Sequence, residues 1–259
     1  MARKIIITSG KGGVGKTTIT VNLGLTLAKS GYRVMLIDGD FGLNNLDVVS
    51  NIDNLIVFDL LDVLNGKCRC KQALVESPNS SNLFILPCKH SLSNVEISGE
   101  KLKKLIFELD NFFDYIFIDS PAGIELGFHR AVSMSTEAII VVTPTISSVR
   151  DADKVLAILK TYKLSSIKLI VNKIRGDLVL SSEMFSASEI SKTLNIDLLG
   201  VIPSDDDLLK GVIDNSCEVE KTFKIIAKAL NGKTDKVYDY LKKYTGFWGS
   251  IRKELKRKL

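Results

Sequence analysis

A glycine-rich segment near the start of the chain constrains its fold more than any other feature. Residues 10–17 read GKGGVGKT and match the pattern G-x-x-x-x-G-K-[ST]. A short apolar run precedes the segment, and a helix-like stretch follows it to Ser30, with Gly31 placed as a helix C-cap glycine. Glycines let backbone N–H groups turn toward phosphate oxygens, and a helix N-terminus adds its dipole. The segment therefore predicts a phosphate-binding loop between a strand and a helix.

The remaining apolar runs predict the sheet that carries this loop. They are continuously apolar rather than alternating, which is typical of strands covered by helices on both faces. The fold class is therefore predicted as α/β, with a doubly wound, mostly parallel sheet of the P-loop NTPase kind. Ligands in such sheets bind at the carboxyl ends of the strands. The predicted strands cover residues 5–8, 33–38, 83–87, 115–119, 138–142, 168–172 and 198–202, and residues 102–109 follow a helical pattern.

Composition narrows the class of protein. Of the 259 residues, 45% are apolar and 25% charged, which is the balance of a soluble globular protein. No apolar run approaches the length of a membrane-spanning helix, and the N-terminus lacks a signal peptide, so we expect a cytosolic protein. The four cysteines show no metal-binding spacing and are interpreted as reduced structural or surface thiols.

Three acidic residues follow predicted strands. Asp38 and Asp40 come directly after the second strand, where a simple turn is the alternative reading. Asp119 ends the strand at residues 115–119, in the place of the Walker-B acid that holds Mg²⁺ through a water. Beside a phosphate loop, these carboxylates favour a Mg²⁺ and water-positioning site. In the same motif, Lys16 is expected to reach the β- and γ-phosphates, and Thr17 to place its hydroxyl on Mg²⁺.

The lysine after the first glycine of the loop points to a particular family. Residues 11–18, KGGVGKTT, resemble the signature of the MinD/ParA family of deviant Walker-A ATPases. The resemblance implies ATP and Mg²⁺ as cofactors and ATP hydrolysis to ADP and phosphate. It also implies an ATP-bound homodimer in which Lys11 crosses to the partner's nucleotide, in the manner of an arginine finger.

The resemblance implies a set of site residues. Asp40 would orient the attacking water, and Asp38 would support that water or Mg²⁺. Asn172 and a Pro-x-Asp turn would lie near adenine, although an ordinary strand-end turn is an equal alternative for Asp205. The implied catalytic residues are Lys11, Lys16, Asp38, Asp40 and Asp119. The implied metal-binding residues are Thr17 and, through a water, Asp119. The implied nucleotide-binding residues are Gly10, Lys11, Gly12, Gly13, Val14, Gly15, Lys16, Thr17, Thr18, Asn172, Pro203 and Asp205.

Three further segments resemble the MinD branch of the family. They are residues 42–47 (GLNNLD), 119–125 (DSPAGIE) and 147–153 (SSVRDAD). In that branch the region around Arg150, Asp151 and Asp153 binds the division inhibitor MinC and the regulator MinE, so these residues are the predicted partner surface. A charged helix N-terminus is the alternative reading of the two acids.

The last residues of the chain predict a separate membrane-targeting element. At 100° per residue, the five bulky apolar residues fall within an arc of about 120°, and most of the basic residues fall outside it. Such a basic amphipathic helix with aromatic anchors is typical of interfacial membrane helices, although a solvated tail or a helix packed on the body is the alternative. Residues 1–245 are therefore predicted as the ATPase domain and residues 246–259 as the membrane helix, with anchors Phe247, Trp248, Ile251, Leu255 and Leu259.

The distribution of charge along the chain indicates which kinds of partner the protein binds. The net charge is +5, but the last 18 residues carry seven basic residues and one acid, which leaves −1 for the body. We therefore expect an anionic membrane surface as a partner and no nucleic acid.

Together these features predict an ATP-dependent, dimerising ATPase. It would be cytoplasmic and peripheral on the inner face of the cell membrane, and would position the division site by recruiting a division inhibitor. MinC and MinE-like activators are the expected protein partners. The alternatives are a flagellar-number regulator, a ParA-type partition ATPase that binds DNA, and a nucleotide-gated membrane adaptor with negligible turnover.

Overall fold

The protein is built around one eight-stranded sheet. The computed structural model describes residues 1–40, 45–88, 98–204 and 218–245. The strands are ordered β3-β4-β2-β5-β1-β6-β7-β8, and all neighbours are parallel except β3 and β4. The strands are β1 (Arg3–Thr8), β2 (Val34–Asp38), β3 (Val75–Ser77), β4 (Ser80–Leu86), β5 (Tyr115–Asp119), β6 (Glu137–Val142), β7 (Ser166–Ile174) and β8 (Leu198–Pro203).

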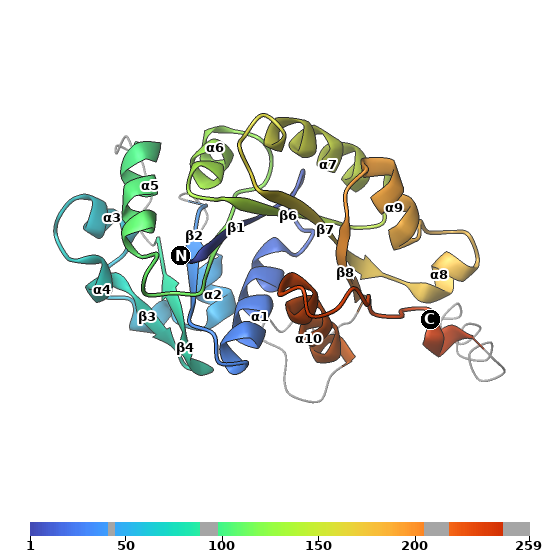
Figure 1. Cartoon of the computed structure of the whole chain (residues 1–259), viewed down its shortest axis with the longest axis horizontal. Coiled ribbons are helices and arrows are strands. Elements are labelled where there is room, and N and C mark those ends of the chain that lie inside the picture. The colour runs from blue at the N-terminus through green and yellow to red at the C-terminus, as the bar shows by residue number, and fades with distance from the viewer. Residues whose placement is uncertain (41–44, 89–97, 205–217, 246–259) are drawn as a thin grey trace.

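Helices cover both faces of this sheet, which confirms the predicted doubly wound α/β class (Figure 1). One face carries α5 (Gly99–Glu108), α6 (Leu126–Ser133), α7 (Ile146–Leu159) and α9 (Ala187–Leu194), and the other carries α1 (Lys16–Lys29) and α10 (Glu218–Leu230). The shorter helices are α2 (Leu46–Ser50), η1 (Asp53–Leu55), α3 (Leu60–Leu64), α4 (Cys70–Ala73), α8 (Gly176–Leu180) and η3 (Lys242–Tyr244).

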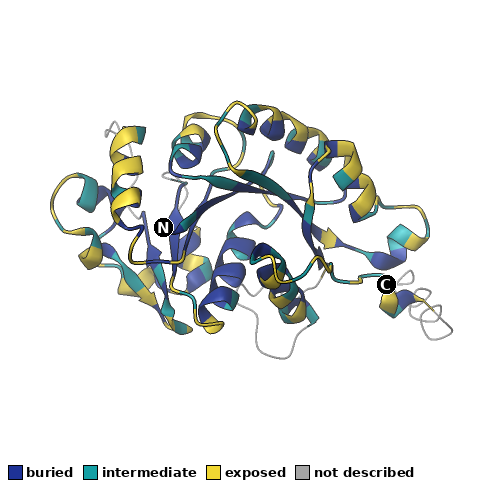
Figure 2. Cartoon of the chain, viewed as in Figure 1, coloured by how far each residue is buried: buried dark blue, intermediate teal, exposed yellow. Residues whose placement is uncertain are grey.

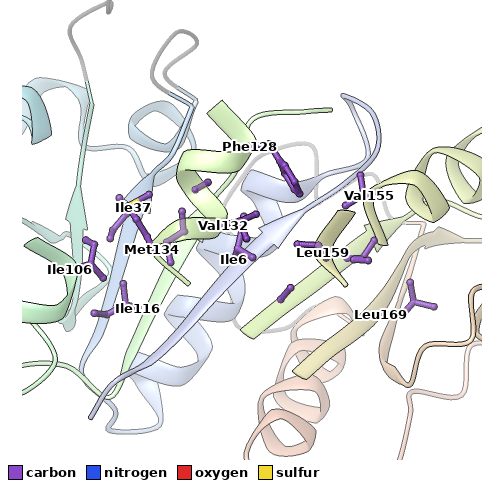
Figure 3. Packing of buried hydrophobic residues seen from close by; sticks show 14 of the residues in the cluster. Ile6, Ile37, Ile106, Ile116, Phe128, Val132, Met134, Val155, Leu159 and Leu169 are labelled. Carbon is purple, nitrogen blue, oxygen red and sulfur yellow. The ribbon is translucent and has the colours of Figure 1, made fainter. Parts of the chain in front are cut away.

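The strands are apolar throughout because each face packs against its own helix layer. Successive side chains of a strand point to opposite faces. Ile6 accordingly packs with α6 and α7, whereas Ile5 and Ile7 pack with α1 and α10, and all three are fully buried. Figure 2 shows the buried sheet between helices that turn their exposed sides outward, and Figure 3 shows Ile6 near Phe128 of α6 and Val155 of α7.

The C-terminal part of the described chain packs on the body. Tyr244 is 7% exposed, and the Lys243 ammonium pairs with Glu218 at the start of α10 at 2.8 Å. None of the helices in the described ranges is long and apolar enough to cross a bilayer. Asp205 and the five predicted membrane anchors lie outside the described residues, so the boundary after residue 245 stays a prediction.

Candidate functional site

The phosphate loop joins β1 to α1 at the carboxyl edge of the sheet. Gly13 and Gly15 have φ values of 76° and 95°, in the left-handed region that favours glycine. Gly15 is also the N-cap of α1, and no side chain caps that end of the helix. The first N–H groups of α1 therefore remain open to an anion, beside the amine of Lys16.

Gly10 is required by a close approach of helix α7. A β-carbon at this position would lie 2.3 Å from the carbonyl carbon of Asp151, which is backbone and cannot move aside cheaply. The first glycine of the motif therefore lets the loop pack directly against the first turns of α7.

Thr17 and Asp119 meet at the start of α1. Thr17 Oγ1 donates a hydrogen bond to Asp119 Oδ2 at 2.5 Å, and Thr20 Oγ1 donates to Asp119 Oδ1 at 3.3 Å. β5 and α1 thus bring together the two residues predicted to hold the metal. Thr20, which the sequence analysis did not include, is the second hydroxyl that orients this carboxylate.

Asp38 lies next to Asp119 because β2 and β5 are neighbours with these two residues in register. It is buried and accepts hydrogen bonds from the N–H groups of Asp40 (2.9 Å) and Leu46 (3.4 Å). Burial, together with the charge of Asp119, raises the pKa of Asp38 well above its ordinary value. Three acids predicted at the ends of two strands, Asp38, Asp40 and Asp119, therefore gather beside the phosphate loop.

The charges in this cluster favour a bound cation. Burial raises the pKa of Asp119 to about 6, partly offset by Thr17 and Lys16, and burial lowers the pKa of Lys16. Carboxylate and hydroxyl oxygens are the ligands that Mg²⁺ prefers. Among the described residues, no group of three His, Cys, Asp or Glu side chains forms a metal site. A Mg²⁺ here would therefore complete its shell with waters and phosphate oxygens, as is usual for this ion.

We expect Asp119→Asn to stabilise the protein when no ligand is present. The folded-state pKa of about 6 exceeds the ordinary value of 3.8, so the folded state binds this proton more tightly and loses stability as pH rises between these values. Each tenfold change in proton affinity is about 1.4 kcal/mol, so the cost is on the order of 2–3 kcal/mol above pH 7. Asparagine keeps an acceptor for Thr17 and does not ionise.

Urea unfolding of both proteins at pH 4 and pH 7 tests this expectation. The advantage of the variant should be small at pH 4 and full at pH 7. Asp197→Asn is the control, because Asp197 is exposed and paired with Lys168 at 2.7 Å. Equal stability of wild type and Asp119→Asn at pH 7 would show that Asp119 is not strained by burial.

Lys11 contacts helix α7. Its Nζ atom donates to the hydroxyl of Ser147, in the first turn of α7, at 3.1 Å. The predicted partner residues follow on the same helix: Arg150 and Asp153 are exposed, and Asp151 pairs with Lys154 at 3.1 Å. The lysine of the loop and the predicted partner surface are therefore neighbours.

Asn172 and Lys173 at the end of β7 contact the phosphate loop. Asn172 Nδ2 donates to the Val14 carbonyl at 2.7 Å, and Lys173 Nζ donates to the Gly13 carbonyl at 2.9 Å. Pro203 ends the neighbouring strand β8. The contacts of Lys173 and Ser147 with the loop were not predicted, because each joins residues more than 130 positions apart in sequence.

Comparisons with known proteins agree with this geometry. A family model described as "AAA domain" matches residues 2–173. The septum site-determining protein MinD of Synechocystis is 41% identical over 263 residues, covering 98% of this chain and 99% of that protein. Two solved structures are similar: the MinC:MinD cell division complex of Aquifex aeolicus (40% identity, TM-score 0.85, 92% of this chain and 99% of that chain) and the Pyrococcus horikoshii MinD with Mg-ADP (31%, 0.78, 91% and 100%).

Proposed function

The chain belongs to the MinD family of septum site-determining ATPases, and we propose that it hydrolyses ATP to control its own dimerisation and membrane binding. On the membrane it recruits a division inhibitor and so positions the division site. The observation that carries the proposal is the meeting of a phosphate loop, an open helix N-terminus and three buried or half-buried acids at one edge of the sheet.

The site residues divide the chemistry of ATP hydrolysis among them. Loop N–H groups and Lys16 bind the β- and γ-phosphates, while Thr17 and Asp119 hold Mg²⁺, the latter through water. Mg²⁺ supplies charge neutralisation on the phosphates. Asp40 orients the attacking water, and Asp38 fixes the loop that carries Asp40 through its hydrogen bond to the Asp40 N–H. The Mg-ADP in the Pyrococcus horikoshii relative supports the binding of a nucleotide with Mg²⁺.

ATP couples to the membrane through the dimer. Lys11 of each subunit completes the site of the other, so ATP favours two joined subunits with two C-terminal helices. One short helix binds a bilayer weakly, whereas two on one particle bind with a large gain in avidity. Hydrolysis separates the subunits and releases the protein to the cytoplasm. Residues 246–259 supply these helices, and residues 1–245 form the ATPase domain.

The MinC:MinD complex of the Aquifex relative supports the division inhibitor MinC as a partner, and the surface of α7 is the proposed binding site for it. Ile146 and Phe185 are 73% and 44% exposed and line a groove of about 330 Å³ between α7 and α9. Arg150 and Asp153 line the same groove. An apolar centre with charged residues at its edge is the usual composition of a protein-binding surface.

We expect charge reversal on this surface to prevent recruitment of MinC. Arg150→Glu combined with Asp153→Lys should weaken MinC binding by about tenfold or more, because each reversed side chain would face a group of the same charge on MinC. The measurement is co-sedimentation of MinC from the same organism with the protein on anionic liposomes in ATP. Lys160→Glu, at the far end of α7, is the control.

The outcomes of this experiment separate the proposed function from its rivals. Recruitment by wild type and the control, but not by the double variant, supports the proposal. Equal recruitment by all three would remove α7 as the MinC surface. No recruitment by wild type would contradict division-site positioning itself and return the nucleotide-gated adaptor to consideration.

A further inference from the structure

Two consecutive residues at the end of β7 hold the outer side of the phosphate loop. Asn172 and Lys173 donate hydrogen bonds to the carbonyls of Val14 and Gly13, at 2.7 and 2.9 Å. The residues joined are 158 and 160 positions apart in sequence. In the sheet, β6 lies between β7 and β1, the strand that precedes the loop, so these contacts fix the loop to a strand that is distant in sequence.

The Asn172 amide is held at both of its ends. While Nδ2 donates to Val14, Oδ1 accepts from the Lys173 N–H at 2.9 Å, and the side chain is 4% exposed. A β-carbon on Gly15 would lie 2.5 Å from Nδ2, so the amide needs a glycine at this point of the loop. One hydrogen of Nδ2 and one lone pair of Oδ1 remain for another partner, so the contact is compatible with the predicted adenine contact.

Lys173 adopts a backbone conformation that lysine rarely takes. Its φ is 58°, in the left-handed region, where a residue with a β-carbon is disfavoured. Such conformations persist only where the surroundings enforce them, and they concentrate at functional sites. In this conformation Lys173 donates two hydrogen bonds. Its backbone N–H donates to Asn172 Oδ1, and its ammonium donates to the Gly13 carbonyl.

Through the geometry of the peptide bond, these two contacts also fix the direction of N–H groups in the loop. In a trans peptide, the C=O and the following N–H lie in one plane and point in opposite directions. Holding the carbonyls of Gly13 and Val14 on the outside therefore directs the N–H groups of Val14 and Gly15 to the inside. These are N–H groups of the loop that receives phosphate oxygens.

We propose that Asn172 and Lys173 form a clamp that presets the N–H groups of the phosphate loop before nucleotide binds. Both are positioning residues, because they act through the loop backbone. The Lys173 contact is charge-assisted and exposed, whereas the Asn172 contact is neutral and buried. The effect on nucleotide affinity rests on the proposed function, whereas the effect on loop order does not.

Lys173→Asn isolates the ammonium. Asparagine tolerates the left-handed conformation and leaves Asn172 in place, but it is too short to reach Gly13. Lys173→Arg keeps a charged donor and tests rescue. Lys168→Asn is the matched control, because Lys168 lies on the same strand and its ammonium pairs with Asp197 rather than with the loop.

Two measurements are made on the full chain: ADP affinity by calorimetry and amide hydrogen exchange of the loop without nucleotide. Lys173→Asn should bind ADP about tenfold more weakly and exchange the loop amides several-fold faster. Lys173→Arg should recover most of both, and the thermal midpoint should match that of the Lys168→Asn control. A purely structural role would lower the midpoint and accelerate exchange throughout the sheet, which would overturn the proposal.

The two readouts also separate failure of the clamp from failure of the proposed function. Loop exchange and ADP affinity equal to wild type in Lys173→Asn would overturn the clamp. If wild type itself does not bind ADP, the proposed function fails. In that case loop exchange in the nucleotide-free protein still decides the clamp, with faster exchange in Lys173→Asn supporting it and unchanged exchange overturning it.

Discussion

Replacing Lys11 with alanine is expected to lower steady-state ATP turnover by about 10³-fold, with little change in the affinity of the isolated chain for ADP. The size follows from the role proposed for this lysine, because a cation supplied in trans to the developing charge on the phosphoryl group is worth 10³–10⁵ in rate. In the proposed mechanism Lys16, not Lys11, binds the phosphates of its own subunit, so ground-state binding should survive.

The structure explains why Lys11 is available to a second subunit. Within the described part of the chain, its ammonium donates to the neutral hydroxyl of exposed Ser147, and Ser147 belongs to the helix that also carries the exposed Arg150 and Asp153. By contrast, Lys16 is 9% exposed, and its charge interacts with Asp119 and Asp40 of its own chain. The two lysines of one short loop therefore have different environments, and only Lys11 faces outward.

Mixing two inactive variants tests action in trans. Lys11→Ala lacks the crossing lysine, and Asp40→Ala lacks the water-positioning acid. In a mixed dimer, the Lys11→Ala subunit keeps its own Asp40 and receives Lys11 from its partner, so one of two equivalent sites is complete. An equal mixture should regain about a quarter of wild-type turnover, since half of the dimers are mixed and each has one active site.

The control for this experiment is a variant at Ser147. Ser147→Ala removes the resting contact of Lys11 and should change turnover by less than about threefold, because a neutral surface hydrogen bond contributes little. If the mixture stays inactive while each variant still binds nucleotide and dimerises with ATP, then Lys11 does not act across the interface. It would then be a phosphate ligand within its own subunit.

The sequence predicts most of the fold because the parallel strands carry a strong local signal. Each is continuously apolar, and each packs against helices on both faces, so one pattern defines both the strand and its place in a layered sheet. The signal fails for β3, a three-residue antiparallel edge strand with a register shift, and for the five-residue helices α2 and α3. Segments this short contain fewer than two repeats of a helical or strand pattern, so no periodicity can be recognised in them.

The sequence likewise predicts only part of the candidate site. Asp38 and Asp119 were predicted at the ends of two separate strands, and the structure places them in register on neighbouring strands. The hydroxyl of Thr20, the left-handed backbone at Lys173 and the contact of Lys11 with Ser147 were not predicted. All three depend on which loops the folded sheet brings together. Residue type and spacing determine the chemistry of the site, whereas its supporting contacts arise only from tertiary structure.

Removal of residues 246–259 is expected to abolish ATP-dependent membrane binding. Each aromatic or aliphatic anchor contributes at most about 1.5–3 kcal/mol, and each basic residue about 1 kcal/mol on an anionic surface. Ordering the helix offsets much of this sum, at about 1–2 kcal/mol per residue. One helix is then a marginal anchor, and two on a dimer gain about 10²–10⁴ in apparent affinity.

A chain ending at Thr245 is the appropriate truncation. Tyr244 is buried and Lys243 pairs with Glu218, so a cut after these residues leaves the packed end of the body intact. Sedimentation with anionic liposomes should show pelleting of the full chain in ATP, much less in ADP, and none for the truncated chain in either nucleotide. ATP turnover without lipid should be equal in the two proteins.

Two full-length variants then distinguish the contribution of apolar burial to membrane binding from that of electrostatic attraction. Phe247→Ser with Trp248→Ser removes the two aromatic anchors and keeps every charge, whereas Lys253→Ser with Arg257→Ser keeps all five anchors and removes two charges. The first should lose pelleting at all salt concentrations, and the second should lose it mainly at high salt, where screening weakens the remaining attraction. Pelleting that survives truncation would place the membrane contact on the body. Pelleting equal in ATP and ADP would separate membrane binding from the dimer, because avidity requires that two helices bind only when ATP joins the subunits.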